Sequence, residues 1–432
     1  MAEIMAGKKF FYFRLILVVF FILNAFKMGF SKEVLTLKDA IERALKANPQ
    51  ITIAIKQKEE FFFQKNLIRA EFFPKLYLSY TFQRVDQGKG RPTSDTHLFG
   101  PTLNWNIFSG FSTYHSFKES LYYISSQDEA IRQKILEVAL AVVSAYVDYF
   151  KQKALLEAAL ADLEDAKIIL KLATKRYEIG LSPYADVLDA EARLKEAEYK
   201  VTNYKYTEDI AKAKVLLLLN EDLQKLDNYE FLPLEEKELE ISPLSELINK
   251  ALTLRPEIAF KEKEILAQKE RIKSVRGEYF PTIDLFTSYY RSDKSFFPDR
   301  DYQFLAGIKI NFPLFTGFST PSKLQKERAT LEKKNTEKRA LELNIQEEVF
   351  SALKQFLTTK ENLISAQAML EKLKEDYRLI QKRYENGLAS IVDLTTTMAR
   401  LSQARTQVAL AQYEIFFKYY QLKKVIGEIP GL

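Results

Sequence analysis

The sequence contains no cysteine and only two histidines, His97 and His115. The lack of cysteine excludes disulfides, thiolate metal ligands, cysteine nucleophiles and a lipid-modified N-terminal cysteine. Two histidines, which we expect at surface or loop positions, are too few for a histidine-based metal site or for acid–base catalysis. We therefore expect no metal ion, no cofactor and no enzyme activity.

Glycine, proline and an excess of one charge are also scarce. Thirteen glycines and thirteen prolines in 432 residues favour long uninterrupted elements. Lysine and arginine number 64 against 58 aspartates and glutamates, and the two signs are mixed along the chain. A nucleic-acid-binding protein needs a concentrated basic face, so we expect no nucleic-acid partner.

The first 31 residues have the organisation of an export signal. Basic residues up to Arg14 precede the apolar run Leu15–Leu23, and small or polar residues follow up to Ser31. This order is typical of a secretory signal peptide, which we place at residues 1–31. The apolar run is shorter than the ~20 residues of a membrane-spanning helix. Its apolar character extends back through Phe10–Phe13, however, and an uncleaved anchor stays an alternative.

The rest of the chain is an internal duplication with a constant offset of 207 residues. Lys175–Leu194 and Lys382–Leu401 are identical at ten of twenty positions. The same offset relates three further pairs: Asn48-Pro49 and Arg255-Pro256, Phe73-Pro74 and Phe280-Pro281, Phe108–Ser112 and Phe315–Ser319. We therefore divide the exported chain into a first structural repeat, residues 32–240, and a second, residues 241–432.

Each repeat begins with helix and continues with two strands. A short amphipathic helix is interrupted at Pro49 or Pro256, because proline lacks a backbone donor, and resumes to about Glu71 or Glu278. Apolar and polar residues then alternate in four segments, which predicts strands with one apolar and one polar face. These segments are 76–83, 99–107, 283–289 and 302–312, and Phe286 breaks the polar face of the third.

Four strands are too few to close a membrane barrel. The smallest single-chain outer-membrane barrels have eight strands, and an open sheet edge in lipid leaves backbone groups unpaired. If these strands span a membrane, several chains must therefore contribute to one barrel. A soluble β-layer packed on helices is the alternative that alternation alone leaves open.

Two very long helices follow the strands. Neither proline nor glycine occurs from Ser112 to Tyr177 or from Ser322 to Glu385, which gives helices of about 100 Å. Such helices need neighbours along their length. A coiled-coil seam is indicated by Ile131, Ile135, Val138, Val142, Ala145 and Tyr149. Each long helix turns at a Gly-Leu pair and returns as a second helix. We also expect the aromatic run Phe61–Phe63 to be core.

The duplicated layout, the Asn-Pro and Phe-Pro junctions, the Phe-Ser-Gly-Phe and Phe-Thr-Gly-Phe motifs and the two Arg-Tyr-Glu-x-Gly-Leu tips resemble the TolC-type outer-membrane efflux family. The resemblance extends from about Leu35 to Ile426. It implies a homotrimer with a twelve-stranded β-barrel in the outer membrane and a twelve-helix α-barrel in the periplasm. It also implies an exit duct for efflux or type I secretion, served by an inner-membrane transporter and a periplasmic adaptor. An exported, non-conducting coiled-coil structural or adhesion protein is the alternative.

The resemblance also assigns roles at the two tips. Periplasmic gate carboxylates would be Asp186, Asp189 and Asp393, and a tip latch would use Tyr177 and Tyr384. The adaptor would contact Gly180, Leu181, Ser182, Gly387, Leu388 and Ala389. The chain departs from the family pattern at Thr396, where a second ring aspartate can occur, and at Ala389, where some members have a basic residue. Helix N-terminal capping is the alternative role of Asp186 and Asp393.

Overall fold

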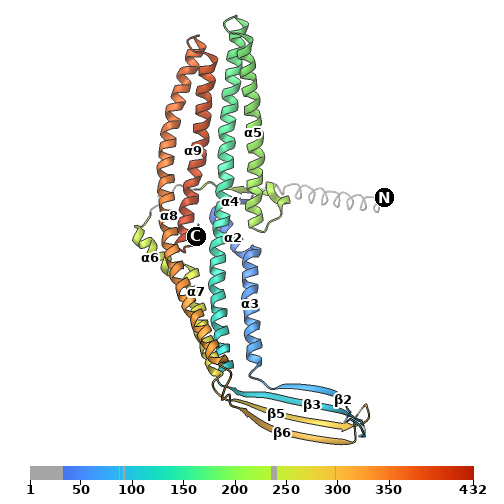
Figure 1. The fold of residues 1–432 in the computed structure, drawn as a ribbon. Helices are drawn as coiled ribbons and strands as arrows, with labels where there is room; N and C mark the ends of the chain where they lie inside the picture. Colours follow the sequence, from blue (N-terminus) through green and yellow to red (C-terminus); the bar gives the residue numbers. More distant parts are fainter. Residues whose placement is uncertain (1–32, 87, 91–92, 235–240, 297) are drawn as a thin grey trace, which may run out of the picture.

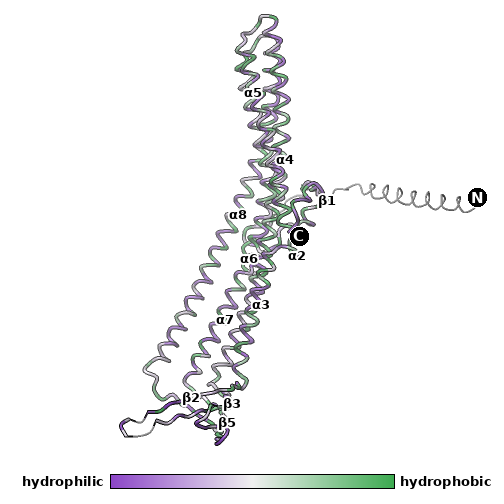
Figure 2. The backbone as a smooth tube through the Cα atoms, turned by 90° about the vertical axis from the view of Figure 1, so that its right-hand side faces the viewer, coloured by the Kyte–Doolittle hydropathy of each residue, from purple (hydrophilic) through white to green (hydrophobic). Residues whose placement is uncertain are grey.

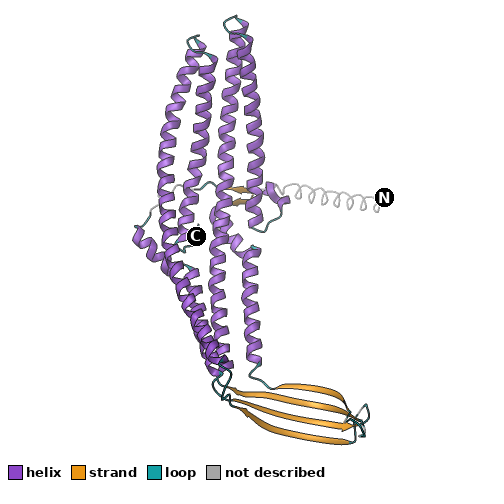
Figure 3. Cartoon of the chain, viewed as in Figure 1, coloured by secondary structure: helices purple, strands orange, loops and turns teal. Residues whose placement is uncertain are grey.

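The computed structural model describes residues 33–86, 88–90, 93–234, 241–296 and 298–432. The predicted signal peptide lies outside the described residues. The described chain is elongated, with a layer of long helices that carries a small β-sheet at one end and two helical hairpin tips at the other (Figure 1). The strands of this sheet project from the lower end of the helices (Figure 3).

The two repeats have helices with the same boundaries at the predicted offset. The first repeat contains α2 (Leu37–Ala47), α3 (Pro49–Ala70), β2 (Lys75–Val85), β3 (Ser94–Ser109), α4 (Ser112–Glu178) and α5 (Tyr184–Leu218). The second contains α6 (Leu244–Leu254), α7 (Pro256–Gly277), β5 (Thr282–Asp293), β6 (Asp301–Asn311), α8 (Ser319–Glu385) and α9 (Ile391–Val425). Every helix of the second repeat begins and ends 207 residues after its counterpart. The predicted duplication, mainly helical fold and antiparallel strands are confirmed.

Prolines divide the helices as expected, with one exception. Pro49 and Pro256 are the first residues of α3 and α7, where a missing backbone donor costs nothing. The Asn48 side chain accepts a hydrogen bond of 2.9 Å from the Gln50 backbone N–H and so caps α3. Helix α8 begins at Ser319, three residues earlier than predicted, because Pro321 lies in its first turn and is tolerated there.

The sheet has the order β2-β3-β5-β6 and is antiparallel throughout. Its polar face includes a hydrogen bond of 2.7 Å from Asn106 Nδ2 to Asp284 Oδ1. Phe286, an aromatic residue on this face, lies opposite Gly307, where a Cβ atom would be only 2.7 Å from the phenyl ring. The glycine therefore makes room for the aromatic ring. Strands β2 and β6 are the edges of this sheet.

The long helices form one layer, and different helices make up its two ends. Toward the tips, the hairpins α4–α5 and α8–α9 lie side by side through α4 and α9. Toward the sheet, α3 and α7 pack on α4, and α7 also contacts α8. Hydrophobic and hydrophilic residues alternate along the helices (Figure 2). None of the described helices has the combination of length and apolarity that crossing a membrane requires.

A short belt between the two ends was not predicted. Strand β1 (Glu33–Leu35) pairs in parallel with β4 (Tyr229–Phe231), which follows the 3₁₀ helix η1 (Leu223–Asn228). The buried Tyr146 hydroxyl donates to the carbonyl oxygens of Leu35 (3.0 Å) and Leu232 (2.7 Å). The linker between the repeats is thereby anchored to α4. Strands of three residues are too short to give an alternating pattern in sequence.

The expectation that Phe61–Phe63 form core is wrong for the single chain. All three side chains are exposed, and the only ring contact of Phe61 in the described chain is with Tyr123 on α4. Helix α3 lies at the edge of the layer with α4 as its one long neighbour, so its outer face stays open.

Candidate functional site: the two hairpin tips

The turns at the two tips have the same backbone geometry. Gly180 and Gly387 have φ values of 75° and 77°, a left-handed conformation that glycine adopts without strain. The next residue of each turn closes back onto the long helix. Leu181 N–H donates to the Arg176 carbonyl oxygen at 2.8 Å, and Leu388 N–H donates to that of Arg383 at 2.7 Å.

The predicted adaptor-contact residues lie in these turns, at the far end of the molecule from the sheet. Leu181 and Leu388 are strongly exposed, and so is Ile179 beside the first turn. Ala389, in contrast, packs against the apolar core of the tip region, and the Ser182 hydroxyl is buried without a hydrogen-bond partner among the described residues.

Asp393, one of the three predicted gate carboxylates, is part of an N-terminal capping box. Its Oδ2 accepts hydrogen bonds from the Ser390 backbone N–H (3.0 Å) and hydroxyl (2.7 Å). The Ser390 hydroxyl in turn accepts from the Asp393 backbone N–H at 3.1 Å. These backbone and side-chain hydrogen bonds from Ser390 lower the pKa of Asp393. Within the chain, Asp393 therefore has the contacts of a helix N-terminal capping residue. Its side chain is also exposed at the tip.

The first tip lacks this box. Pro183 occupies the N-cap of α5 and makes no side-chain hydrogen bond, so Asp186, at the third helical position, has no capping partner. Its side chain is half-buried. Asp189, one turn further, accepts a hydrogen bond of 3.1 Å from Arg193 Nε.

The two predicted latch tyrosines have opposite environments. Tyr384 is 1% exposed and Tyr177 is 45% exposed. The ring of Tyr177 contacts that of Tyr184 with centroids 5.2 Å apart. The Tyr384 hydroxyl is buried without a hydrogen-bond partner in the described part of the chain. Burial raises the pKa of this phenol, while the nearby Arg176 charge opposes the shift.

Arg176 is a tip residue that sequence reasoning missed. Its Nη1 donates to the Tyr384 carbonyl oxygen at the end of α8, and its guanidinium carbon lies 4.7 Å from the centroid of the Tyr384 ring. This contact joins the ends of α4 and α8 and so links the two hairpins. The duplicated motif gave no signal for it, since Arg383 has the same sequence context but is exposed.

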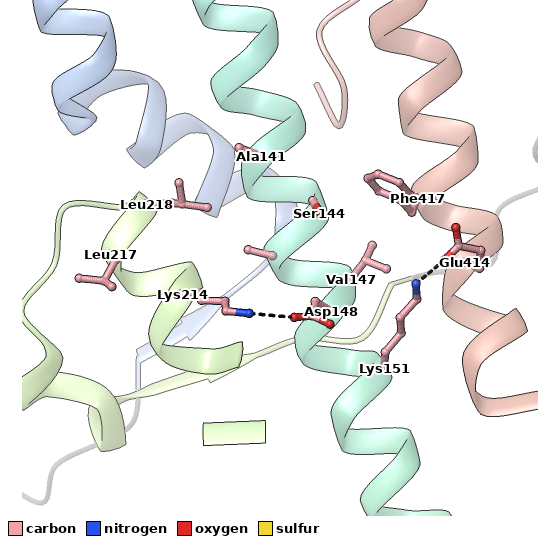
Figure 4. A pocket seen from close by; sticks show the side chains of 11 residues that line it. Ala141, Ser144, Val147, Asp148, Lys151, Lys214, Leu217, Leu218, Glu414 and Phe417 are labelled. Carbon is pink, nitrogen blue, oxygen red and sulfur yellow. Dashed lines mark hydrogen bonds and ion pairs between the residues drawn. The ribbon is translucent and has the colours of Figure 1, made fainter. Parts of the chain in front are cut away.

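A cavity of about 600 Å³ lies between α4, α5 and α9, nearer the belt (Figure 4). Apolar side chains such as Leu217 and Phe417 line it, together with an ion pair between Lys214 and Asp148 (3.7 Å) and another between Lys151 and Glu414. The described residues contain no cluster of three or more metal-ligating side chains.

The two histidines lie elsewhere. His97 lies in β3 between aromatic rings, and the Nδ1 atom of the half-buried His115 is 2.7 Å from Glu270 Oε2.

Comparison with known proteins identifies the family. The family model for outer membrane efflux proteins matches residues 40–221 and 247–428, once in each repeat. The chain belongs to the outer membrane efflux protein family. As a member of this family of channels, the efflux protein resides in the outer membrane and extends into the periplasm.

Individual relatives are distant but cover most of the efflux protein. The alkaline protease secretion protein AprF of Pseudomonas aeruginosa is 21% identical over 425 residues, covering 94% of this chain and 85% of that protein. The toluene efflux pump outer membrane protein TtgC of Pseudomonas putida is 24% identical over 398 residues, covering 85% of this chain and 78% of that protein. The solved structure of the outer-membrane channel OprN matches with a TM-score of 0.77 at 19% identity, covering 90% of this chain and 89% of that one.

Proposed function

We propose that three copies of this chain assemble into the exit duct of an efflux or secretion system. The two unpaired edges of the sheet support this proposal. Strands β2 and β6 are both edges, and unpaired backbone groups in lipid cost several kcal/mol each. If β6 of one copy pairs with β2 of the next, three copies give a closed barrel of twelve strands without an edge.

The helical layer has matching edges. Near the tips the layer ends at α5 on one side and α8 on the other. Both helices expose large apolar side chains, and four of those on α8 recur every seven residues, as in a coiled-coil seam. These are Leu343, Phe350, Leu357 and Ile364 on α8, and Tyr199, Tyr206, Ile210 and Leu217 on α5. Packing of α8 against α5 of the next copy would cover both sets and close a barrel of twelve helices.

Two partners follow from this role. TtgC is named for a toluene efflux pump and AprF for protease secretion, which supports a duct that serves an inner-membrane transporter. A periplasmic adaptor would join the duct to the transporter and would bind the duct at the exposed tip leucines, Leu181 and Leu388. The transporter would supply the energy for transport through the duct.

The gate is proposed at the same end. Asp186 and Asp393 lie in the first turns of α5 and α9, and Asp189 lies one turn further along α5, so three copies would place rings of carboxylates near the tip. Such rings favour cations and repel anions. Of the two latch tyrosines, Tyr384 is the one whose contacts within the chain can hold the hairpins together.

The first measurement is the native mass of the detergent-extracted protein from separated membranes. Three chains in the outer-membrane fraction are expected, and a soluble monomer or dimer would contradict the duct. The gate is then tested by single-channel cation selectivity of Asp393→Ala and Asp186→Ala. Asp209→Ala, which removes an exposed carboxylate of α5 far from the tip, is the control. Unchanged selectivity in both tip variants would contradict the gate.

A further inference from the structure

The two hairpins meet along one stripe of α4. The stripe residues are spaced by three or four positions, so they lie on a single face of the helix. They are Lys151, Leu155, Ala159, Asp162, Ala166, Ile169, Ala173 and Arg176. Most are buried, and Ala166, Ile169 and Ala173 share a core with residues of α8 and α9.

Three polar contacts interrupt this apolar stripe. Lys151 pairs with Glu414 of α9 near the belt, Asp162 contacts α9 in the middle, and Arg176 contacts α8 at the tip. All three join the first hairpin to the second. A separation that begins at the free tips would break these contacts in order, with that of Arg176 first.

The middle contact is a largely buried cluster with several charge-assisted hydrogen bonds. Arg405 Nη1 donates to Asp162 Oδ1 at 2.6 Å and to Asp165 Oδ2 at 2.7 Å. The Ser402 hydroxyl donates to the other oxygen of Asp162. From α8, Tyr377 lies next to Asp165, and burial raises the pKa of both Asp165 and Tyr377. Separation of the hairpins at this level would break all of these charge-assisted hydrogen bonds together.

The tip contact is weaker. Arg176 makes one hydrogen bond to a carbonyl oxygen and one ring contact. Three buried polar atoms of the tip region, Arg176 Nε, the Ser182 hydroxyl and the Tyr384 hydroxyl, have no hydrogen-bond partner within the described chain, whereas the middle cluster has one such atom, the Tyr377 hydroxyl. Each of these atoms lost hydration without a compensating bond, and so each makes this arrangement less stable. Opening of the tip lets water reach them.

We propose that the Asp162–Asp165–Arg405 cluster is a stop that limits how far the two hairpins separate. This inference rests on the proposed duct function, in which the tips part to admit cargo. The segment that separates is Ala166–Glu178 with its partners on α8 and α9, roughly 20 Å of helix. The part of the stripe between the cluster and the belt stays closed.

The lack of native cysteine allows a direct test. Single cysteines are introduced at Ala173, between the cluster and the tip, and at Ala159, between the cluster and the belt. Both alanines lie on the stripe and are buried, with exposures of 0% and 3%. The rate of modification by a small maleimide is measured on the detergent-extracted native assembly, with and without Arg176→Met.

With Arg176→Met, modification of Ala173→Cys is expected to accelerate by about tenfold or more, while Ala159→Cys stays protected. A second variant removes the stop without leaving unpaired charges: Asp162→Asn, Asp165→Asn and Arg405→Met together. In this triple variant, Ala159→Cys is expected to react with the maleimide as fast as Ala173→Cys does. The native mass of this variant is checked first, so that fast labelling caused by misfolding is not taken for loss of the stop.

Three results would overturn the proposal. Equal acceleration of both cysteines by Arg176→Met would show that the cluster stops nothing. Continued protection of Ala159→Cys in the neutral variant would place the stop elsewhere. No acceleration of Ala173→Cys would show that separation does not begin at the tip. Conductance of the unmodified protein is measured in parallel, and its absence would contradict the duct function while the labelling pattern still reports on the stop.

Discussion

The two hairpin tips share a sequence motif and a backbone turn, yet their side chains have different environments. Tyr384 is buried under Arg176, whereas Tyr177 is largely exposed. Asp393 is held in a capping box with Ser390, whereas Asp186 follows a proline that cannot form one. Duplication therefore copied the motif, but its contacts depend on which neighbour each hairpin meets within the layer.

The largest expected difference between the tips concerns the tyrosines. Tyr384→Ala removes a fully buried ring, and we expect the tip to lose about 3–5 kcal/mol of local stability. Tyr177→Ala removes an exposed ring and should cost less than about 1 kcal/mol. Hydrogen exchange of the segments around residues 170–190 and 378–395 measures both effects. Equal losses would mean that Tyr177 is also buried in the assembly.

The Tyr384 hydroxyl is expected to contribute little to tip stability. It has no hydrogen-bond partner in the described chain, so Tyr384→Phe should be neutral or slightly stabilising in the same exchange experiment. A clear loss of protection would show that the hydroxyl makes a bond in the assembly.

The arginines of the two tips are the next comparison. Arg176→Met removes a hydrogen bond from a charged donor and a cation–π contact, together worth about 2 kcal/mol. We therefore expect the open-to-closed ratio in single-channel recordings to rise by a factor of about 30. Arg383→Met, at the corresponding exposed position, should have a much smaller effect. Similar increases for both variants would contradict the difference between the tips.

Exchange of the caps should make the tips more alike. Ser390→Ala removes the capping box of α9 and is expected to cost about 1 kcal/mol. Pro183→Ser places a serine three residues before Asp186 and should stabilise the start of α5 by a similar amount. Amide exchange in the first turns of α5 and α9 measures both. A Pro183→Ser variant without added protection would show that the turn cannot adopt cap geometry.

The smallest expected effect is a pH dependence at Asp393. Its hydrogen bonds from Ser390 lower the pKa below the ordinary aspartate value of about 3.9. The stabilisation by the cap is therefore present above that value and is lost as the pH falls through the lowered pKa. Exchange protection at the start of α9 should persist at pH 4 in the wild type. In Ser390→Ala, protection that shows the same pH dependence would contradict this assignment.

Several features could be predicted because their causes are local. Proline fixes the helix starts at Pro49 and Pro256, and a polar–apolar period of two identifies the four strands. A constant offset identifies the duplication. The error at Phe61–Phe63 has a different origin, since burial of an aromatic run depends on whether a neighbour covers it.

The sequence by itself determined the repeat, the lengths of the helices, the position of the turns and the family. These follow from periodicity, turn residues and motif spacing, which act over a few residues. Only the tertiary structure decided that Arg176 and not Arg383 joins the hairpins, that Tyr384 and not Tyr177 is buried, and that Arg405 binds two aspartates of α4. The physical reason is that the two copies of the motif meet different neighbours. Arg176 on α4 faces the second hairpin and covers the Tyr384 ring, whereas Arg383 on α8 and Tyr177 on α4 have no such partner within the described chain.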